Sequence, residues 1–442
     1  MKNIKYLVLI PLMFGCSQPS TETAFEELMD SEWSKMVADN PVYASSMGDL
    51  SRNTEWPDTS VENIYSDHQY ELNVLTQLQE LNTTQFTEDN KVNYSLFKKQ
   101  YENSIEAHAY QTFLMPFSHR GGIQLQHETT SIVPLRNKQH YLDWIERISK
   151  IDELVEASIA RAKIGIEENI VPPRFLMQKV YKQIELQAFV EPKDSPFYRA
   201  FLEMDRSVGD QDVREIQTQA LQIIKTKVIP AYVELHSFFK DEYLPACRTS
   251  IGIKEIKNGK EYYEFLARKF TTTELTPKEI HEIGLAEVKR IRVEMDAIIK
   301  EVKWGGTFES FLDDLRTNPK FYYETSEELF ESYLATSKRI DPELVKLFKV
   351  LPSMPYGLKP IPMESAPDTT TAYYQRPAAD GSRAGYYFVN LYRPEVRPKY
   401  EIEVLSVHEA MPGHHLQIAL AMELDLPNFR KYGGITAFVE GW

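Results

Sequence analysis

The stretch from residue 404 to residue 442 constrains the fold more than any other, because it places metal-binding side chains around a helix-breaking pair. It reads VLSVHEAMPGHHLQIALAMELDLPNFRKYGGITAFVEGW and holds three of the chain's ten histidines, with a glutamate directly after the first of them. Apolar residues before and after the histidines predict helix on both sides. Two imidazoles and one carboxylate are the ligands of a catalytic zinc ion, which keeps a fourth position for water. The stretch therefore predicts a zinc site held by helices.

The spacing of the histidines requires a break in that helix. His408 and His414 are six positions apart, and in a straight helix the second would lie about 9 Å higher and about 120° around the axis. Proline removes a backbone donor and clashes with the preceding turn, and glycine relaxes the backbone. We expect Pro412 and Gly413 to interrupt the helix and return His414 to the face of His408. His415 would share that face in an unbroken helix but lie about 10.5 Å along it, so it is the second choice of ligand.

Two glutamates complete the predicted site. Glu440 follows His414 by 26 residues, with Asp425-Leu426-Pro427 and Gly433-Gly434 between them. These breakers predict that the helix ends and that a second helix returns to present Glu440 as the third ligand. Glu409 stands beside His408, where zinc peptidases of the HExxH type carry their general base.

These residues resemble a known family. HEAMPGHH followed by FVEGW resembles the bacterial family called domain of unknown function 885, which itself resembles zinc peptidases that take two histidines from one helix and a glutamate from the next. HLQIALAMELDLP followed by FVEGW is also similar to the corresponding part of angiotensin-converting enzyme. The inserted Pro-Gly departs from HExxH.

The resemblance implies a mainly α, large helical zinc-peptidase-like fold with a small β-hairpin or sheet near the metal helix. It implies one zinc ion on His408, His414 and Glu440, with Glu409 as the catalytic base acting on a peptide or small amide substrate. The family normally continues beyond Trp442 through a helical segment bearing Arg, Asp and His, so we expect this sequence to be C-terminally incomplete.

Two other functions remain open. One is an inactive or binding-type lipoprotein with a structural metal or none, and the other is a zinc hydrolase of non-peptide amides or esters.

Two other His-Glu pairs in the chain serve for comparison with the motif. His281-Glu282 and His127-Glu128 begin as the 408–409 pair does but lack a second histidine at usable spacing, so we expect both pairs to be structural.

Residues 1–16, MKNIKYLVLIPLMFGC, have the pattern of a signal peptide: a basic start and an apolar run too short to span a bilayer. The final Gly-Cys resembles a bacterial lipobox, which implies a lipid anchor on Cys16. Met13 and Phe14 are imperfect for that motif, so ordinary cleavage or a retained anchor stays open. Ser17 resembles the residue that sends lipoproteins to the outer membrane. We expect a periplasm-facing lipoprotein in the cell envelope, with residues 17–23 as a polar tether.

The length of the chain predicts more than one subdomain. A chain of 442 residues is too long for one ordinary core. We expect an N-terminal helical subdomain over residues 24–245 and a catalytic subdomain over 246–442.

The net charge of −15 without a basic block argues against a nucleic-acid partner. If Cys16 carries lipid, Cys247 is the only other cysteine, and no intrachain disulfide can form.

From residue 24 to about residue 243 the spacing of apolar residues is mostly that of helices. Thr276-Pro277 with Glu279 predicts a capped helix start, and the apolar face that follows, to about Val302, predicts packing on one side. The segment from 351 to 367 carries five prolines and few helical signals.

A hairpin is expected next, with strands near 370–376 and 384–391 around a turn at 379–382. In zinc peptidases of this kind the edge strand of such a sheet accepts the extended substrate. Tyr386, Tyr387 and Asn390 are candidates to border the cleft, and Arg383 is a candidate to hold a substrate carboxylate. Structural roles are the alternative for all four.

Overall fold

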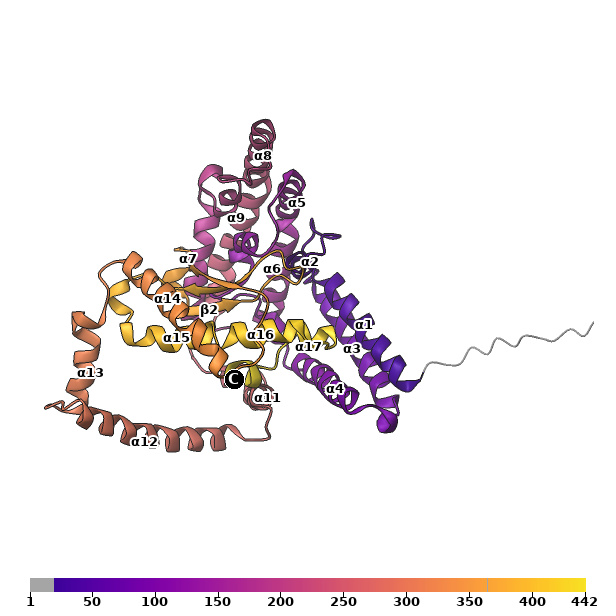
Figure 1. Ribbon diagram of the computed structural model, residues 1–442. Helices are drawn as coiled ribbons and strands as arrows, with labels where there is room; N and C mark the ends of the chain where they lie inside the picture. Colours follow the sequence, from indigo (N-terminus) through magenta and orange to yellow (C-terminus); the bar gives the residue numbers. More distant parts are fainter. Residues whose placement is uncertain (1–19, 364) are drawn as a thin grey trace, which may run out of the picture.

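The computed structural model describes residues 20–363 and 365–442 as a mainly helical chain with one small mixed sheet (Figure 1). The signal peptide, Cys16 and residues 17–19 of the tether lie outside the described residues. Within the described part, no helix combines the length and apolar character needed to cross a bilayer. The mainly α fold class with a small sheet, expected from the sequence, is confirmed.

The N-terminal half consists of helices, and four of them begin at side-chain caps. The side chains of Ser20, Ser60, Thr87 and Asn137 each accept a hydrogen bond from the amide three residues later, which satisfies one of the free donors of a helix start. The helices of this half are α1 (Thr21–Asp39), α2 (Pro41–Met47), α3 (Val61–Glu80), α4 (Glu88–His108), α5 (Lys138–Ile148), α6 (Ile151–Glu167), α7 (Arg174–Ala188), α8 (Asp210–Ile223), α9 (Ile229–Phe238) and α10 (Leu244–Ala246).

The largest hydrophobic core lies among α5 to α9. Its members sit at helical spacing, so each helix turns one apolar face inward. Trp144, Val180, Tyr232 and Leu235 are almost fully buried in it. A second core, formed by α1, α3 and α4, contains Phe25, Leu78 and Phe97 among its members. The buried aromatic side chains of this half therefore form cores between helices.

The exposed apolar face of α12 (Pro277–Glu301) corrects one expectation. The helix begins as predicted, because Thr276 and Glu279 form both hydrogen bonds of a capping box. Its apolar face is nevertheless open: Leu285 and Val288 are 53% and 67% exposed, and Ile299 is its one buried residue. Apolar periodicity shows that a helix has a face to bury, but it does not supply the partner.

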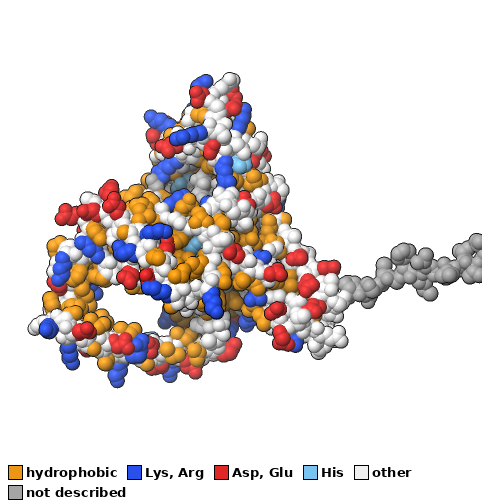
Figure 2. All heavy atoms as spheres, viewed as in Figure 1, with side chains coloured by type: hydrophobic (Ala, Val, Ile, Leu, Met, Phe, Trp, Pro, Cys, Tyr) orange, Lys and Arg blue, Asp and Glu red, His pale blue; other side chains and the backbone are white. Residues whose placement is uncertain are grey.

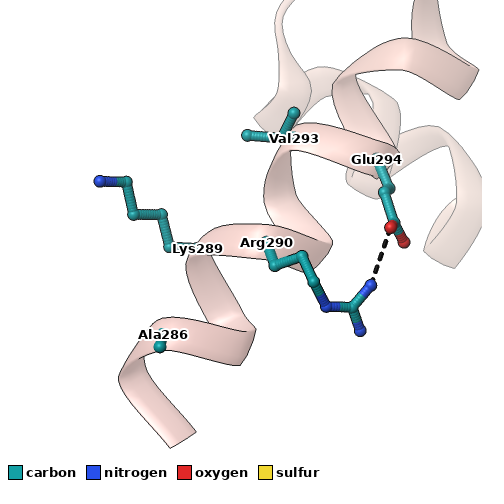
Figure 3. A pocket seen from close by; sticks show the side chains of 5 residues that line it. All are labelled: Ala286, Lys289, Arg290, Val293 and Glu294. Carbon is teal, nitrogen blue, oxygen red and sulfur yellow. Dashed lines mark hydrogen bonds and ion pairs between the residues drawn. The ribbon is translucent and has the colours of Figure 1, made fainter. Parts of the chain in front are cut away.

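Figure 1 shows α12 and α13 (Phe308–Thr317) as an arm outside the body, and Figure 2 shows an opening between this arm and the body. A hollow of about 390 Å³ on α12 is lined by that helix alone (Figure 3). Its five residues are Ala286, Lys289, Arg290, Val293 and Glu294. No second element encloses this hollow, and it contains none of the candidate metal-binding residues.

The sheet has the order β1-β3-β2, with β1 (Tyr356–Pro360) parallel and β2 (Ala372–Gln375) antiparallel to β3 (Gly385–Val389). The predicted hairpin is thus confirmed as β2 and β3. Strand β1 was not expected, because it lies in the proline-rich segment.

Helices α14 (Ser326–Ile340) and α15 (Ile402–Glu409) pack on the sheet. Their shared core holds Tyr333 of α14, Tyr387 of β3, and Ile402 with Ala410 from α15 and its end. This core supports the helix that carries the first histidine of the motif. Another helix of this half, α11 (Gly259–Thr271), lies against α4.

A matched pair of leucines tests the division between core and open face. Leu235→Ala in α9 should lower the free energy of unfolding by roughly 2–5 kcal/mol, because the side chain is fully buried. Leu285→Ala in α12 should change it by less than about 0.5 kcal/mol, because that side chain is exposed. Chemical denaturation of both variants measures the difference. Equal losses would show that the α12 face is covered in solution.

Candidate metal centre

The helix that carries the motif is interrupted between α15 and α16 (His414–Glu423). Within the break, the amide of Gly413 donates to the carbonyl of Val407 (2.9 Å) and the amide of His415 to that of Ala410 (3.0 Å). A Cβ atom at position 413 would lie 1.9 Å from the carbonyl oxygen of His408. Only glycine fits this close approach, so the sequence permits the turn at this position.

The interruption brings the two histidines together. The rings of His408 and His414 have centroids 4.5 Å apart, although a straight helix would separate these positions by about 9 Å along its axis. After α16 the chain passes through α17 (Asn428–Tyr432) and returns in α18 (Thr436–Gly441), which presents Glu440. Glu440 Oε2 lies 3.6 Å from His408 Nε2 and 3.9 Å from His414 Nε2.

A second carboxylate, that of Glu409, borders the same space. Its Oε2 lies 3.9 Å from His414 Nε2, and ligand atoms of His408, Glu409 and His414 all lie within 4.8 Å of one another. The two glutamates differ in setting, since the side chain of Glu409 is 9% exposed and that of Glu440 is 57% exposed. Glu440 lies within 3.9 Å of both imidazoles and is the candidate for the third ligand, whereas Glu409 is the more buried of the two carboxylates.

Burial changes the proton affinity of the inner groups. It raises the pKa of Glu409 to about 7; the negative charge of Glu440 adds to this rise, and a backbone hydrogen bond from Tyr374 opposes it. Burial also lowers the pKa of His414, and the neighbouring His408 lowers it further, while Glu440 acts in the opposite direction. A neutral imidazole is the form that binds a metal ion.

The donor set fits zinc. Two imidazole nitrogens and a carboxylate oxygen bind zinc at about 2.0–2.2 Å in a tetrahedral arrangement, which requires neighbouring ligand atoms to lie roughly 3.3–3.6 Å apart. The nitrogen–oxygen distances of 3.6 and 3.9 Å are close to that requirement. His408, His414 and Glu440 could therefore hold one ion with small side-chain adjustments.

His415, the second choice of ligand from the sequence, is not part of the cluster. Its Nδ1 lies 2.8 Å from the Tyr374 hydroxyl and its Nε2 lies 3.0 Å from the carbonyl of Met354. The residue is 1% exposed, and burial lowers its pKa to about 4. Because both ring nitrogens are already hydrogen-bonded, the structure favours His414 as the second ligand. The break turns residue 414, not residue 415, towards His408.

The four hairpin candidates divide into two groups. Tyr387 and Asn390 are buried in the core instead of bordering a cleft: Tyr387 is fully buried, and Asn390 Nδ2 donates to the carbonyls of Ala366 and Thr370. Alternation along a strand shows which residues share a face, but the hairpin alone does not show which face is covered.

Arg383 and Tyr386 are half-buried. Arg383 donates to the carbonyl of Arg376 (3.1 Å), and burial lowers its pKa. Lys359 Nζ lies over the ring of Tyr386 (3.8 Å). Their roles in substrate binding stay predictions.

One residue beside the cluster was missed. The hydroxyl of Tyr374 in β2 hydrogen-bonds His415, and its backbone lies close enough to Glu409 to lower the pKa of that carboxyl group. The only sequence signal was its place in the expected strand before the turn, which does not reveal that β2 lies beside α15.

The two other His-Glu pairs lie away from the cluster. His281 is exposed on α12, and His127 Nδ1 lies 3.0 Å from Gln187 Nε2.

Comparisons with known proteins agree with this fold. The profile of a family described as "Bacterial protein of unknown function (DUF885)" matches residues 41–442. A solved structure of a candidate lipoprotein from Colwellia psychrerythraea superimposes with a TM-score of 0.86 at 23% identity, covering 96% of this chain and 76% of the other. A candidate lipoprotein of unknown function from Shewanella oneidensis gives a TM-score of 0.62 at 14% identity, with coverages of 94% and 77%. No curated protein sequence is significantly similar to the chain.

A pair of glycine substitutions tests the turn. Gly413→Ala should destabilise the chain by about 1–3 kcal/mol or more, because the added methyl group would overlap the His408 carbonyl. Gly284→Ala, in the open middle of α12, should instead stabilise it by about 0.5–1 kcal/mol. Urea denaturation reports both values. A Gly413→Ala variant as stable as the parent would contradict the close approach.

Proposed function

The chain belongs to the DUF885 family of bacterial proteins, and from that premise we propose that it is a zinc-dependent hydrolase of peptide bonds, with a zinc-peptidase-like fold. One observation carries the proposal: His408, His414 and Glu440 converge to nitrogen–oxygen distances of 3.6 and 3.9 Å. A buried carboxylate, Glu409, borders the same space.

Zinc bound by these three residues would act as a Lewis acid towards water and a scissile carbonyl. The protein itself supplies the proton transfer. The Glu409 carboxylate accepts a proton from the attacking water and delivers it to the leaving amine. Its place suits that role, because its carboxylate lies 3.9 Å from His414 Nε2 and its side chain is only 9% exposed.

Strand β2 is the element that would align a substrate. It pairs with β3 alone among the described strands, so its other edge has no strand partner there. An extended peptide can add to such an edge by main-chain hydrogen bonds. Tyr374 lies in β2, which contacts α15, and its backbone is near enough to Glu409 to lower the pKa of that group. A peptide bound along this edge would therefore lie close to the proposed catalytic base.

We also propose that the protein is a lipoprotein of the bacterial cell envelope, held on the periplasmic side of the outer membrane by lipid on Cys16. The signal-peptide pattern of residues 1–16 supports this. Two proteins of similar structure are described as candidate lipoproteins.

Substitutions in the cluster separate metal binding from proton transfer. Glu409→Gln should retain zinc but lower the hydrolysis rate of a peptide library by about 10²–10⁴-fold, because the amide cannot accept the proton. His408→Ala should lose both zinc and activity. Glu282→Gln is the matched control, since it follows a histidine on the exposed α12 and should change neither. Metal analysis by mass spectrometry and a peptide-cleavage assay give the two readouts.

Wild-type turnover in the Glu409→Gln variant would contradict the assigned chemistry. Stoichiometric zinc without cleavage of any peptide would instead favour a binding-type lipoprotein. Chelator-sensitive cleavage of amides or esters in the absence of peptide cleavage would favour the third hypothesis.

A further inference from the structure

His415 is buried next to a proposed ligand, and both of its ring nitrogens have partners. Nε2 lies 3.0 Å from the carbonyl oxygen of Met354. A carbonyl oxygen can only accept, so Nε2 carries the proton. In the neutral ring Nδ1 is then the acceptor, and the Tyr374 hydroxyl, 2.8 Å away, donates to it. The two contacts thus fix the tautomer of His415 and the direction of each hydrogen bond.

These contacts join three separate elements. His415 belongs to α16, Tyr374 to β2, and Met354 to the segment that leads into β1. The other end of α16 holds the same segment, because Glu423 Oε1 accepts from the amide of Ser353 (2.7 Å) and from that of Met354 (3.3 Å). The helix is therefore bound to this segment at both of its ends, and to the sheet at the His415 end.

The sequence makes room for this connection at Gly385 of β3. A Cβ atom there would lie 2.5 Å from the Tyr374 hydroxyl and 3.0 Å from His415 Nδ1. Any other residue would push apart the two groups that are hydrogen-bonded. The glycine, the tyrosine and the histidine therefore form one arrangement, and a side chain at position 385 is incompatible with it.

We infer that His415 is a positioning residue, which through Tyr374 fixes the free edge of β2 against Glu409. Tyr374 reaches α16 with its side chain and Glu409 with its backbone. A shift of its side chain moves the same residue's amide, and with it the edge that would align a peptide. This functional part rests on the proposed hydrolase activity, whereas the contact of β2 with Glu409 does not.

Tyr374→Phe tests the inference because it removes one oxygen atom and keeps the ring. Replacement of His415 itself would leave a cavity in a buried site and could prevent folding. With the hydroxyl gone, His415 Nδ1 has no donor, and β2 loses its connection to α16. In the zinc-free chain, we expect the amide of residue 374 to exchange hydrogen about tenfold faster or more. In the zinc-loaded chain, kcat/KM for peptide cleavage should fall roughly 10–100-fold, mainly through KM, with zinc content unchanged.

Tyr373→Phe is the control, since this neighbouring ring of β2 stacks on Phe388 and is 37% exposed. It should leave both the exchange rate and kcat/KM within about twofold of the parent. Equal exchange at residue 374 in the two variants would overturn the positioning role, and so would an unchanged kcat/KM. If the unaltered chain cleaves no peptide, the proposed function fails, yet hydrogen exchange still decides whether His415 holds β2 in place.

Discussion

The candidate metal centre depends on one close approach of the backbone to itself. The α carbon of Gly413 lies where a Cβ atom would meet the carbonyl oxygen of His408 at 1.9 Å and that of Val407 at 2.4 Å. Because no side chain occupies this space, the chain ends α15 and begins α16 within four residues. The rings of His408 and His414 then come together, although a continuous helix would turn them apart.

The surrounding structure holds this turn from two sides. On one side, Tyr333 and Tyr387 form a buried core with Ile402 and Ala410, which supports α15 up to its end. On the other, His415 binds Tyr374 of the sheet, and His415 and Glu423 both bind the segment that leads into β1. His414, the proposed ligand, and His415, which is hydrogen-bonded through both ring nitrogens, are adjacent in sequence, and the direction of the break decides which of them turns towards His408. A buried, fully paired polar side chain such as that of His415 specifies one arrangement more than it adds stability.

Sequence reasoning predicted the parts governed by local rules. Capping residues located the starts of helices such as α12, β-branched and aromatic residues around a turn located β2 and β3, and the Pro-Gly pair located the break between the histidines. It missed what depends on tertiary partners. The strand β1 is paired only because β3 lies beside it, Tyr387 and Asn390 are buried by elements distant in sequence, and the apolar pattern of α12 does not reveal that its face is open. Tyr374 was missed for the same reason, since its role arises where β2 meets α15 and α16.

X-ray absorption at the zinc edge of the purified chain tests the central claim most directly. If the turn at Gly413 assembles the site as described, the spectrum should show one zinc ion per chain, with two imidazole nitrogens and at least one carboxylate oxygen at about 2.0–2.2 Å, and replacement of His414 should remove one imidazole. Zinc bound without imidazole, or with both imidazoles retained after that replacement, would contradict the account.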